Sequence, residues 1–355
     1  SMFSKRTLLG PVLLLVTVAI GYPAYWLYAA SLSESLLQNW IEEQRLNGIT
    51  VNYRSVERSG FPLVIRLTLP ALEASNAEMG FSWRSEKLQL ELQPWDLRRL
   101  RLDALGPQQV QFKPSQDVAN FTANTAGFSG VAVIGNSSAF TALSIALKEV
   151  RLTESEKGQL MQSGRILADI RRPEKRPIAH TEPAFEISLA AEQINTATVK
   201  APILGDTIAN IRVKAEFLGP LDGDTLIDAV SSWRQSGGTV EVHWLNLIWG
   251  ALDLRANGTI ALDPELRPLG ALTADIRGYE EALEALAEAQ LIRRDILPAS
   301  RVTLNLLAKT SETDGRRVLT VPVNAQGGGL YLGPIKLAEL PVLLNPPSHP
   351  SVRQD

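Results

Sequence analysis

A long uncharged run near the amino terminus constrains this chain more than any other feature. Lys5 and Arg6 precede Thr7–Leu32, a run without a charged side chain that is rich in leucine, valine and alanine. An α-helix rises about 1.5 Å per residue, so roughly 20 residues of this kind cross the hydrocarbon core of a bilayer. The run therefore predicts a transmembrane anchor over residues 7–30, after a short stub over residues 1–6.

The residues that flank the run predict its orientation. Aromatic side chains cluster at its far end, and such rings prefer the level of the lipid headgroups. The basic residues precede the run, and an excess of Lys and Arg marks the cytoplasmic side of a membrane protein. We therefore expect the stub in the cytoplasm, the remaining chain across the membrane, and interfacial contacts from Tyr22, Tyr25, Trp26 and Tyr28.

A cleaved signal peptide is the alternative interpretation of the same run. Ala29 and Ala30 are small residues of the kind that a signal peptidase requires at its cleavage site. However, the apolar run is long for a signal peptide, and bulky aromatic residues crowd this position. An uncleaved anchor is therefore the favoured interpretation.

A second, amphipathic helix is predicted directly after the anchor, over residues 31–48. Ser31 and Glu34 have the spacing of a capping box, in which both side chains bind free amides at a helix start. Apolar residues then recur at helical spacing, and Gly48 suits a helix end. This helix either packs on the domain that follows, or lies on the membrane or against a partner.

From Ile49 onwards the hydrophobic period changes to two, which is typical of β-strands. Alternating segments recur along the chain, separated by short turns. Few helical segments intervene, whereas a parallel α/β sheet needs a helix between most strands. The chain is therefore predicted to be mainly β (α+β), with curved antiparallel sheets, a few short helices and one N-terminal transmembrane helix.

The β-rich domain is predicted over residues 49–345, with two similar halves that meet near 171–183. A tail over 346–355 is rich in proline and lacks apolar periodicity, which predicts disorder. Within the second half, helical spacing predicts helices at Asp222–Trp233 and Tyr279–Arg294.

Two more local signals are specific enough to test. Asn257 and Gly258 both accept the positive φ of a tight hairpin, so a turn is predicted there. Alternation predicts a strand at Arg301–Lys309.

The segment Gly237–Asp263 exchanges its apolar face locally. Apolar residues occupy even positions up to Trp244, odd positions from Leu245 to Trp249, and even positions again after Gly250. A β-bulge inserts one extra residue and would produce this change. The odd-numbered side chains then need cover, either from the helix at 279–294 or from an apolar ligand.

Three stretches, at Leu63–Ile65, Val131–Ile134 and Trp244–Trp249, are apolar on both faces of their strands. A covering helix or a bulge explains this, and so does a curved sheet whose concave face binds acyl chains. Burial of each methylene would then contribute about 0.8 kcal/mol. The candidate groove residues are Leu245, Leu247, Ile248, Trp249, Val64, Val131 and Val133.

A basic stretch stands at the predicted junction of the two halves. It is flanked by prolines, which favours a solvated loop. Basic side chains near an anionic membrane surface contribute about 1 kcal/mol each, so lipid contact is the alternative. The candidate headgroup contacts are Arg171, Arg172, Lys175 and Arg176.

Composition excludes several classes of chemistry. The chain has no cysteine, so disulfides, thiolate metal sites and cysteine nucleophiles are absent, and its three histidines are far apart. The net charge of −3 argues against nucleic-acid binding. Neither a Gly-x-Ser-x-Gly elbow nor a phosphate-loop signature occurs. We therefore expect a protein without catalytic activity, metal or cofactor.

Several phrases resemble domain of unknown function family 2125, a family of membrane-anchored bacterial envelope proteins. They are "SGFPL" at Ser59–Leu63, "QPW" at Gln93–Trp95, "WRQSGGTVEV" at Trp233–Val242, "IWGALDLRANGTIALD" at Ile248–Asp263, "RPLGAL" at Arg267–Leu272 and "GLYLGPIKLAELPVL" at Gly329–Leu343. The repeated strand texture is also similar, more loosely, to AsmA-like envelope proteins, which have been associated with lipid movement between membranes.

The resemblance implies a single-pass protein of the bacterial inner membrane whose main domain lies in the periplasm. Together with the two-faced apolar strands, it suggests a protein that binds phospholipid or another apolar envelope molecule in a β-sheet groove. The alternative is a structural or adaptor subunit that binds other envelope proteins.

Overall fold

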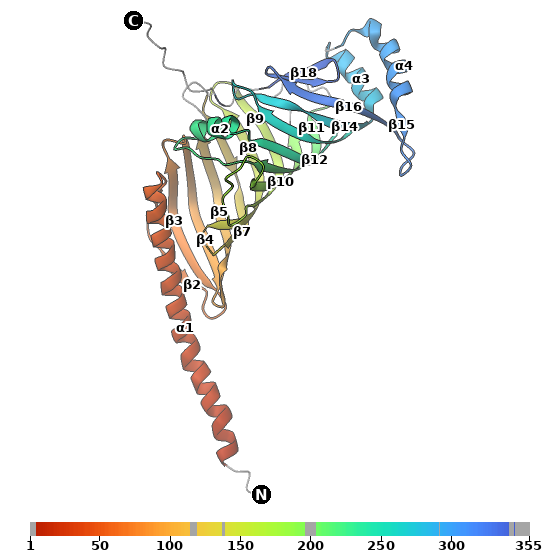
Figure 1. Cartoon of the computed structure of the whole chain (residues 1–355). Helices are drawn as coiled ribbons and strands as arrows, with labels where there is room; N and C mark the ends of the chain where they lie inside the picture. Colours follow the sequence, from red (N-terminus) through yellow and green to blue (C-terminus); the bar gives the residue numbers. More distant parts are fainter. Residues whose placement is uncertain are drawn as a thin grey trace, which may run out of the picture.

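The structure is a computed structural model, and it describes residues 5–113, 119–136, 139–195, 204–290, 292–340 and 344. Most of these residues form strands of one large antiparallel sheet, accompanied by helices α1 to α4 (Figure 1). The predicted mainly β architecture with a few helices and a long apolar N-terminal helix is therefore confirmed. The predicted tail over 346–355 lies outside the described residues.

Helix α1 (Lys5–Leu46) is one unbroken element, where the sequence predicted an anchor and a separate helix over 31–48. The predicted capping box does not form. Instead the Ser31 hydroxyl accepts a hydrogen bond from Arg58 Nη1 at 3.1 Å, and Glu34 pairs with the same guanidinium. These side chains thus attach the helix to the sheet. α1 is long and apolar enough to cross a membrane, and it fits a single-pass anchor.

The neighbouring strands of the sheet all pair antiparallel. From edge to edge the order is β2, β3, β4, β5, β7, β8, β9, β10, β11, β12, β13, β14, β16, β17 and β18; β1 also pairs with β3, β6 with β5 and β8, and β15 with β16. The strands are β1 (Thr50–Asn52), β2 (Glu57–Ser59), β3 (Ile65–Asn76), β4 (Phe81–Gln93), β5 (Asp96–Phe112), β6 (Phe121–Thr125), β7 (Gly127–Ile134), β8 (Phe140–Glu154), β9 (Gly158–Arg171), β10 (Pro183–Asn195), β11 (Thr207–Leu218), β12 (Thr239–Trp249), β13 (Leu252–Leu262), β14 (Pro268–Arg277), β15 (Lys309–Thr310), β16 (Arg317–Gln326), β17 (Gly329–Leu332) and β18 (Ile335–Glu339).

The register gives the sheet one apolar and one polar face, because successive side chains of a strand point to opposite sides. One row of paired residues runs from β3 to β17 and is apolar throughout: Ile65, Leu92, Leu100, Ala132, Leu143, Ile170, Ile187, Ala215, Val242, Gly258, Leu272, Val323 and Leu332. The next row, on the other face, is mostly polar: Arg66, Glu91, Arg101, Val131, Ser144, Asp169, Ser188 and Lys214.

One-residue phase changes keep the apolar side chains on the same face along the strands. In β12, Val242 pairs with Gly258 and Leu245 with Ala256, so β12 has one extra residue. The predicted bulge is therefore confirmed, and it lies at His243 and Trp244. Comparable irregularities with positive φ occur inside β3, β8 and β10, at Ala71, Glu149 and Gln193.

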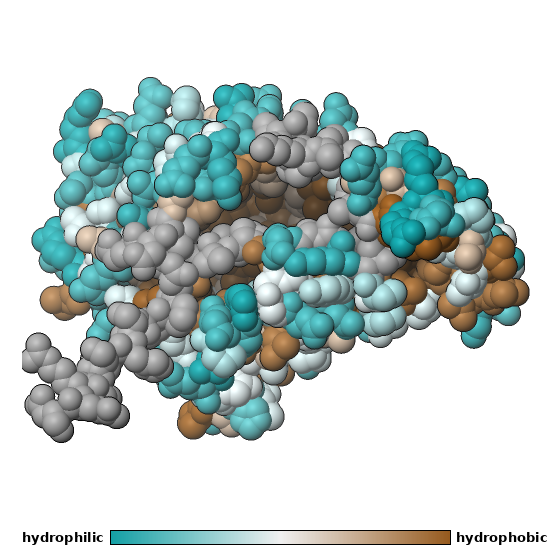
Figure 2. Space-filling model, turned by 90° about the horizontal axis from the view of Figure 1, so that it is seen from above, coloured by the Kyte–Doolittle hydropathy of each residue, from teal (hydrophilic) through white to brown (hydrophobic). Residues whose placement is uncertain are grey.

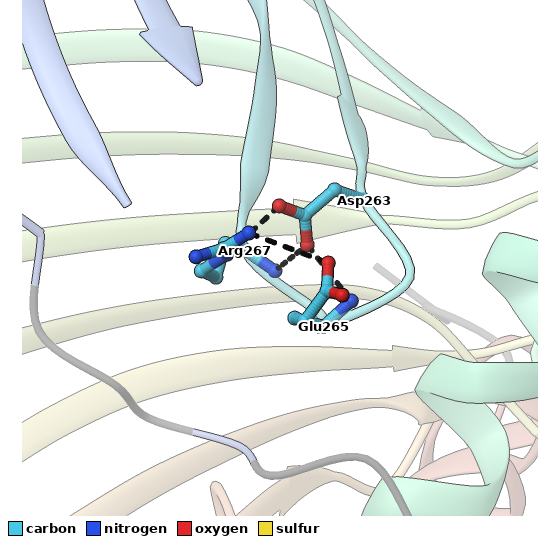
Figure 3. A network of polar contacts seen from close by, with 3 residues as sticks. All are labelled: Asp263, Glu265 and Arg267. Carbon is cyan, nitrogen blue, oxygen red and sulfur yellow. Dashed lines mark hydrogen bonds and ion pairs between the residues drawn. The ribbon is translucent and has the colours of Figure 1, made fainter. Parts of the chain in front are cut away.

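The hairpin predicted at Asn257 and Gly258 does not form there, because both residues lie within β13 and pair with β14. The turn follows Asp263 instead (Figure 3). Asp263 Oδ1 accepts from the backbone amides of Glu265 (3.0 Å) and Arg267 (2.9 Å), and Oδ2 accepts from Arg267 Nε at 2.8 Å. A buried carboxylate that satisfies the turn amides thus replaces the expected Asn-Gly turn.

Two predictions after β14 are also corrected. Helix α3 (Tyr279–Glu288) is shorter than predicted, and a 3₁₀ turn, η1 (Arg294–Ile296), follows. The strand predicted at Arg301–Lys309 is largely helix α4 (Leu297–Leu307). Leu297 packs against Leu283 and Ala287 of α3, so contact between the two helices overrides the alternating pattern.

Candidate functional site

The central part of the apolar face has no helix packed over it among the described residues. It extends over β8 to β12, and we call it the central apolar face. Its side chains are half-buried, except for Leu189, which is 36 % exposed. By contrast Ile65, Leu67 and Leu69, on the same face in β3, are at most 1 % exposed. The central apolar face comprises Leu143, Ile145, Leu147, Ile166, Ala168, Ile170, Ile187, Leu189, Ala191, Ile211, Val213, Leu245 and Leu247.

On the same face of the sheet, helices cover the strands that flank this region in both directions. α1 packs over β3, β4 and β5 through Trp26, Ala29 and Ala30. At the other side Tyr279 of α3 and Leu304 of α4 pack against β14 and β16. Seen from above, the molecule is hollowed, with a hydrophobic inner wall and a largely hydrophilic outer surface (Figure 2). We call this hollow the channel and infer that the central apolar face forms its wall.

Aromatic side chains close one end of the central apolar face. The rings of Phe185 and Phe217 stack with their centroids 4.3 Å apart, and Phe217 is 6.3 Å from Trp233 of α2 (Leu226–Gln235). Trp233 Nε1 donates to the carbonyl of Leu218 at 2.7 Å, which fixes the helix on the strand end. Gly238 is required here, because a Cβ atom would lie 2.3 Å from the Trp233 ring.

The size of the central apolar face suits an extended hydrocarbon chain. Neighbouring strands are about 4.8 Å apart, so the four spacings from β8 to β12 span about 19 Å. Its side chains are leucine, isoleucine, valine and alanine, without a charged group. Such a surface binds by excluding water and gives little directional specificity.

The structure places only some of the predicted groove residues on this face. Leu245 and Leu247 belong to it. Trp249 points the same way at the end of β12, where its Nε1 donates to the carbonyl of Gly205 at 3.0 Å. Ile248 lies between Leu247 and Trp249 in the strand and therefore faces the polar side.

The remaining predicted groove residues lie elsewhere. Val131 and Val133 are on the polar face of β7, because Gly130 and Ala132 occupy the apolar one. Val64 precedes β3, and its carbonyl accepts a hydrogen bond from Trp26 Nε1 at 3.0 Å. The structure therefore does not bring these three residues together with Leu245 and Leu247.

Most of the central apolar face lies outside the stretches that are apolar on both sides of a strand. Ile187 and Val213 belong to ordinary alternating strands, in which both of their sequence neighbours are polar. The available signal was the alternation itself, combined with the order of elements, in which one short helix, α2, is described between β8 and β12.

Three of the four predicted interfacial aromatic residues bind the sheet. Tyr22 and Tyr25 donate their hydroxyl protons to the carbonyls of Pro62 and Pro94, the latter at 2.5 Å, and Trp26 donates its Nε1 proton to the carbonyl of Val64. Tyr28 is exposed. We call the contacts of Tyr22, Tyr25 and Trp26 the aromatic joint.

The basic stretch at residues 171–176 is exposed and far from the aromatic joint. The Arg172 amide donates to the carbonyl of Thr141, next to Phe140, whose ring contacts Trp40 at 6.0 Å. Trp40 follows Trp26 by fourteen residues, about 21 Å along the helix. A membrane surface potential decays over roughly 8–10 Å. This position therefore does not favour contact of Arg171, Arg172, Lys175 or Arg176 with the anchoring bilayer.

One group of possible metal ligands lies on the polar face. Oxygen atoms of Glu186 and Glu216 and a ring nitrogen of His243 come within 4.8 Å of one another. These donors suit a divalent cation, but Lys214 Nζ already lies 3.4 Å from Glu186 Oε1 and neutralises part of the charge. His349 lies outside the described residues.

The comparisons with known proteins give one family. A family model described as "Uncharacterized protein conserved in bacteria (DUF2125)" matches residues 26–341. The match begins at the aromatic joint and extends over the sheet. No curated protein matches the chain. The looser AsmA-like resemblance is not confirmed.

Proposed function

The chain belongs to the DUF2125 family of bacterial proteins, and we propose that it binds lipid or another apolar envelope molecule in the channel, without covalent chemistry. The carrying observation is the central apolar face, which is continuous with two helix-covered cores but is itself half-exposed. Contiguous exposed apolar surface on a soluble domain commonly marks a binding site.

The energetics support a hydrocarbon ligand. A chain of about ten methylenes that leaves a bilayer for water loses about 8 kcal/mol of hydrophobic stabilisation. A channel that shields those methylenes offsets most of this loss. The same channel offers few polar groups that could orient a small hydrophilic substrate.

The proposed location follows from the helix and its flanking charges. α1 crosses the bacterial inner membrane once, with Lys5 and Arg6 in the cytoplasm and the sheet in the periplasm. The sheet then stands in the aqueous space between two membranes, where an apolar ligand needs protection from water.

An adaptor role is the second candidate, and the sheet edge gives it less support. β18 is an edge strand of the described sheet, and strand addition by a partner requires an accessible edge. Lys336 and Glu339 pair with each other on β18. Charged side chains on an edge strand discourage pairing with another chain.

The test measures bound lipid in the full-length protein extracted from its own membrane in mild detergent. Native mass spectrometry and lipid extraction are applied to wild type, Leu189→Asp and Ala190→Asp. Leu189 lies on the central apolar face, whereas Ala190 faces the polar side opposite Arg212, so the second variant is the matched control. We expect lipid on wild type and Ala190→Asp, and an occupancy at least about tenfold lower on Leu189→Asp, equivalent to about 1.4 kcal/mol.

Leu189 is already partly exposed, so a carboxylate there stays hydrated in the empty channel and the fold is retained. Wild type without any lipid, or equal occupancy in both variants, would refute the proposed function.

A further inference from the structure

The loops that bind the aromatic joint carry large apolar side chains that face solvent. Phe61 is 53 % exposed, Leu63 69 % and Trp95 65 %. Phe61 and Leu63 lie in the connection between β2 and β3, and Trp95 in the turn between β4 and β5. We call these three side chains the apolar tip.

The aromatic joint fixes the position of the apolar tip relative to α1. Tyr22 and Trp26 bind the carbonyls of Pro62 and Val64, which flank Leu63, and Tyr25 binds that of Pro94, which precedes Trp95. The Phe61 ring also contacts that of Trp26, with centroids 5.5 Å apart and nearly perpendicular planes. Hydrogen bonds from α1 to both loops therefore hold the tip beside the helix.

The apolar tip lies at the level where the hydrocarbon core should end. From Thr7, the first residue after the basic pair, to Trp26 the helix rises about 29 Å, close to the hydrocarbon thickness of about 30 Å. The exposure of α1 changes at the same point: Leu13, Leu14 and Leu15 are largely exposed, whereas Trp26, Ala29 and Ala30 are buried against the sheet.

We infer that Phe61, Leu63 and Trp95 insert into the bilayer surface beside α1, so that the sheet is docked on the membrane at a fixed angle. The partner is a lipid bilayer, and the inference holds whether or not the channel carries lipid. Exposed apolar and tryptophan side chains gain free energy at the boundary between hydrocarbon and headgroups.

Docking gives the sheet a defined orientation. α1 extends beyond the joint alongside β3 (Figure 1). Leu92 and Leu100, at the tip ends of β4 and β5, pack in the same core as Trp26. The part of the apolar face that α1 covers therefore begins at the bilayer surface.

The test exploits the absence of cysteine from the chain. Leu63→Cys, Trp95→Cys and Glu78→Cys are each labelled with an environment-sensitive fluorophore in the full-length protein, reconstituted into phosphatidylcholine vesicles. Glu78 is exposed in the turn between β3 and β4 and is the control. β3 has 12 residues, so this turn lies about 40 Å from the tip.

We expect lipids brominated near the headgroup to quench the labels at 63 and 95 several-fold more than the label at 78, and aqueous iodide to show the opposite order. Labels at 63 and 95 that respond like the label at 78 would overturn the inference. Lipid bound in the channel is measured separately by mass spectrometry, so a failure of docking is distinguishable from a failure of the proposed function.

Discussion

The turn after β13 depends on one carboxylate, and replacement of Asp263 should measure its contribution. Asp263 is only 7 % exposed and accepts three hydrogen bonds within the turn, from Glu265 and Arg267. Asp263→Ala leaves two backbone amides without their acceptor and removes a charge-assisted bond. We expect the free energy of unfolding to fall by about 2–3 kcal/mol, because each lost bond contributes about 1 kcal/mol when water partly replaces it.

Asp263→Asn is an informative intermediate. Its remaining oxygen can still accept from both backbone amides, so we expect a loss of only about 1 kcal/mol. Asp253→Ala is the control, because Asp253 lies 3.8 Å from the exposed Arg255 in a loose ion pair worth less than about 0.5 kcal/mol.

The assay is urea unfolding of the full-length protein in mild detergent, with hydrogen exchange at residues 263–267 as a local readout. Faster exchange should be confined to the Asp263 variants. An Asp263→Ala variant within about 0.5 kcal/mol of wild type, or as protected as the Asp253 control, would refute this account of the turn.

Three further predictions follow from individual contacts. Asn257→Ala should leave the melting temperature unchanged, whereas Gly258→Ala should lower it, because its Cβ would lie 2.3 Å from the Ala271 carbonyl; the reverse order would favour a turn at these residues. Gly238→Ala should displace Trp233 and cost about 1–3 kcal/mol, and unchanged tryptophan emission would contradict this. The Arg316 amide, which donates to the Asp314 carboxylate, lowers the pKa of Asp314. The ionised carboxylate therefore stabilises the fold above the unfolded pKa near 3.9, and this stabilisation is lost as pH falls through the lower folded pKa. Asp314→Asn should lower the melting temperature at pH 7, and that difference should vanish in acid.

The phase of apolar residues predicted the bulge in β12 correctly, because a bulge changes which residues share a face. The hairpin prediction at Asn257 and Gly258 failed for a different reason. Asn-Gly favours a turn locally, but ten pairings with β14 hold β13 extended through this point. At Arg301–Lys309 alternation was ambiguous over a short segment, and packing of Leu297 and Leu304 selected a helix.

The candidate groove residues also show which features local sequence patterns can predict and which they cannot. Leu245 and Leu247 were identified because the exchange of faces made them conspicuous. Val131 and Val133 were not on the channel side, because an apolar run does not reveal which of its members points inward. Ile187 and Val213 looked ordinary in sequence, since polar residues alternate with them.

The apolar N-terminal helix and the amphipathic character of the sheet could be predicted from the sequence. Both follow from the local periodicity of side chains on a helix or a strand. Which parts of the apolar face are covered depends on the packing of the helices and could not be predicted. α1 covers β3 to β5, and α3 and α4 cover β14 and β16, while β8 to β12 remain half-exposed. Alternation records the side to which a side chain points, but the element that packs against it is set by contacts between residues far apart in the chain.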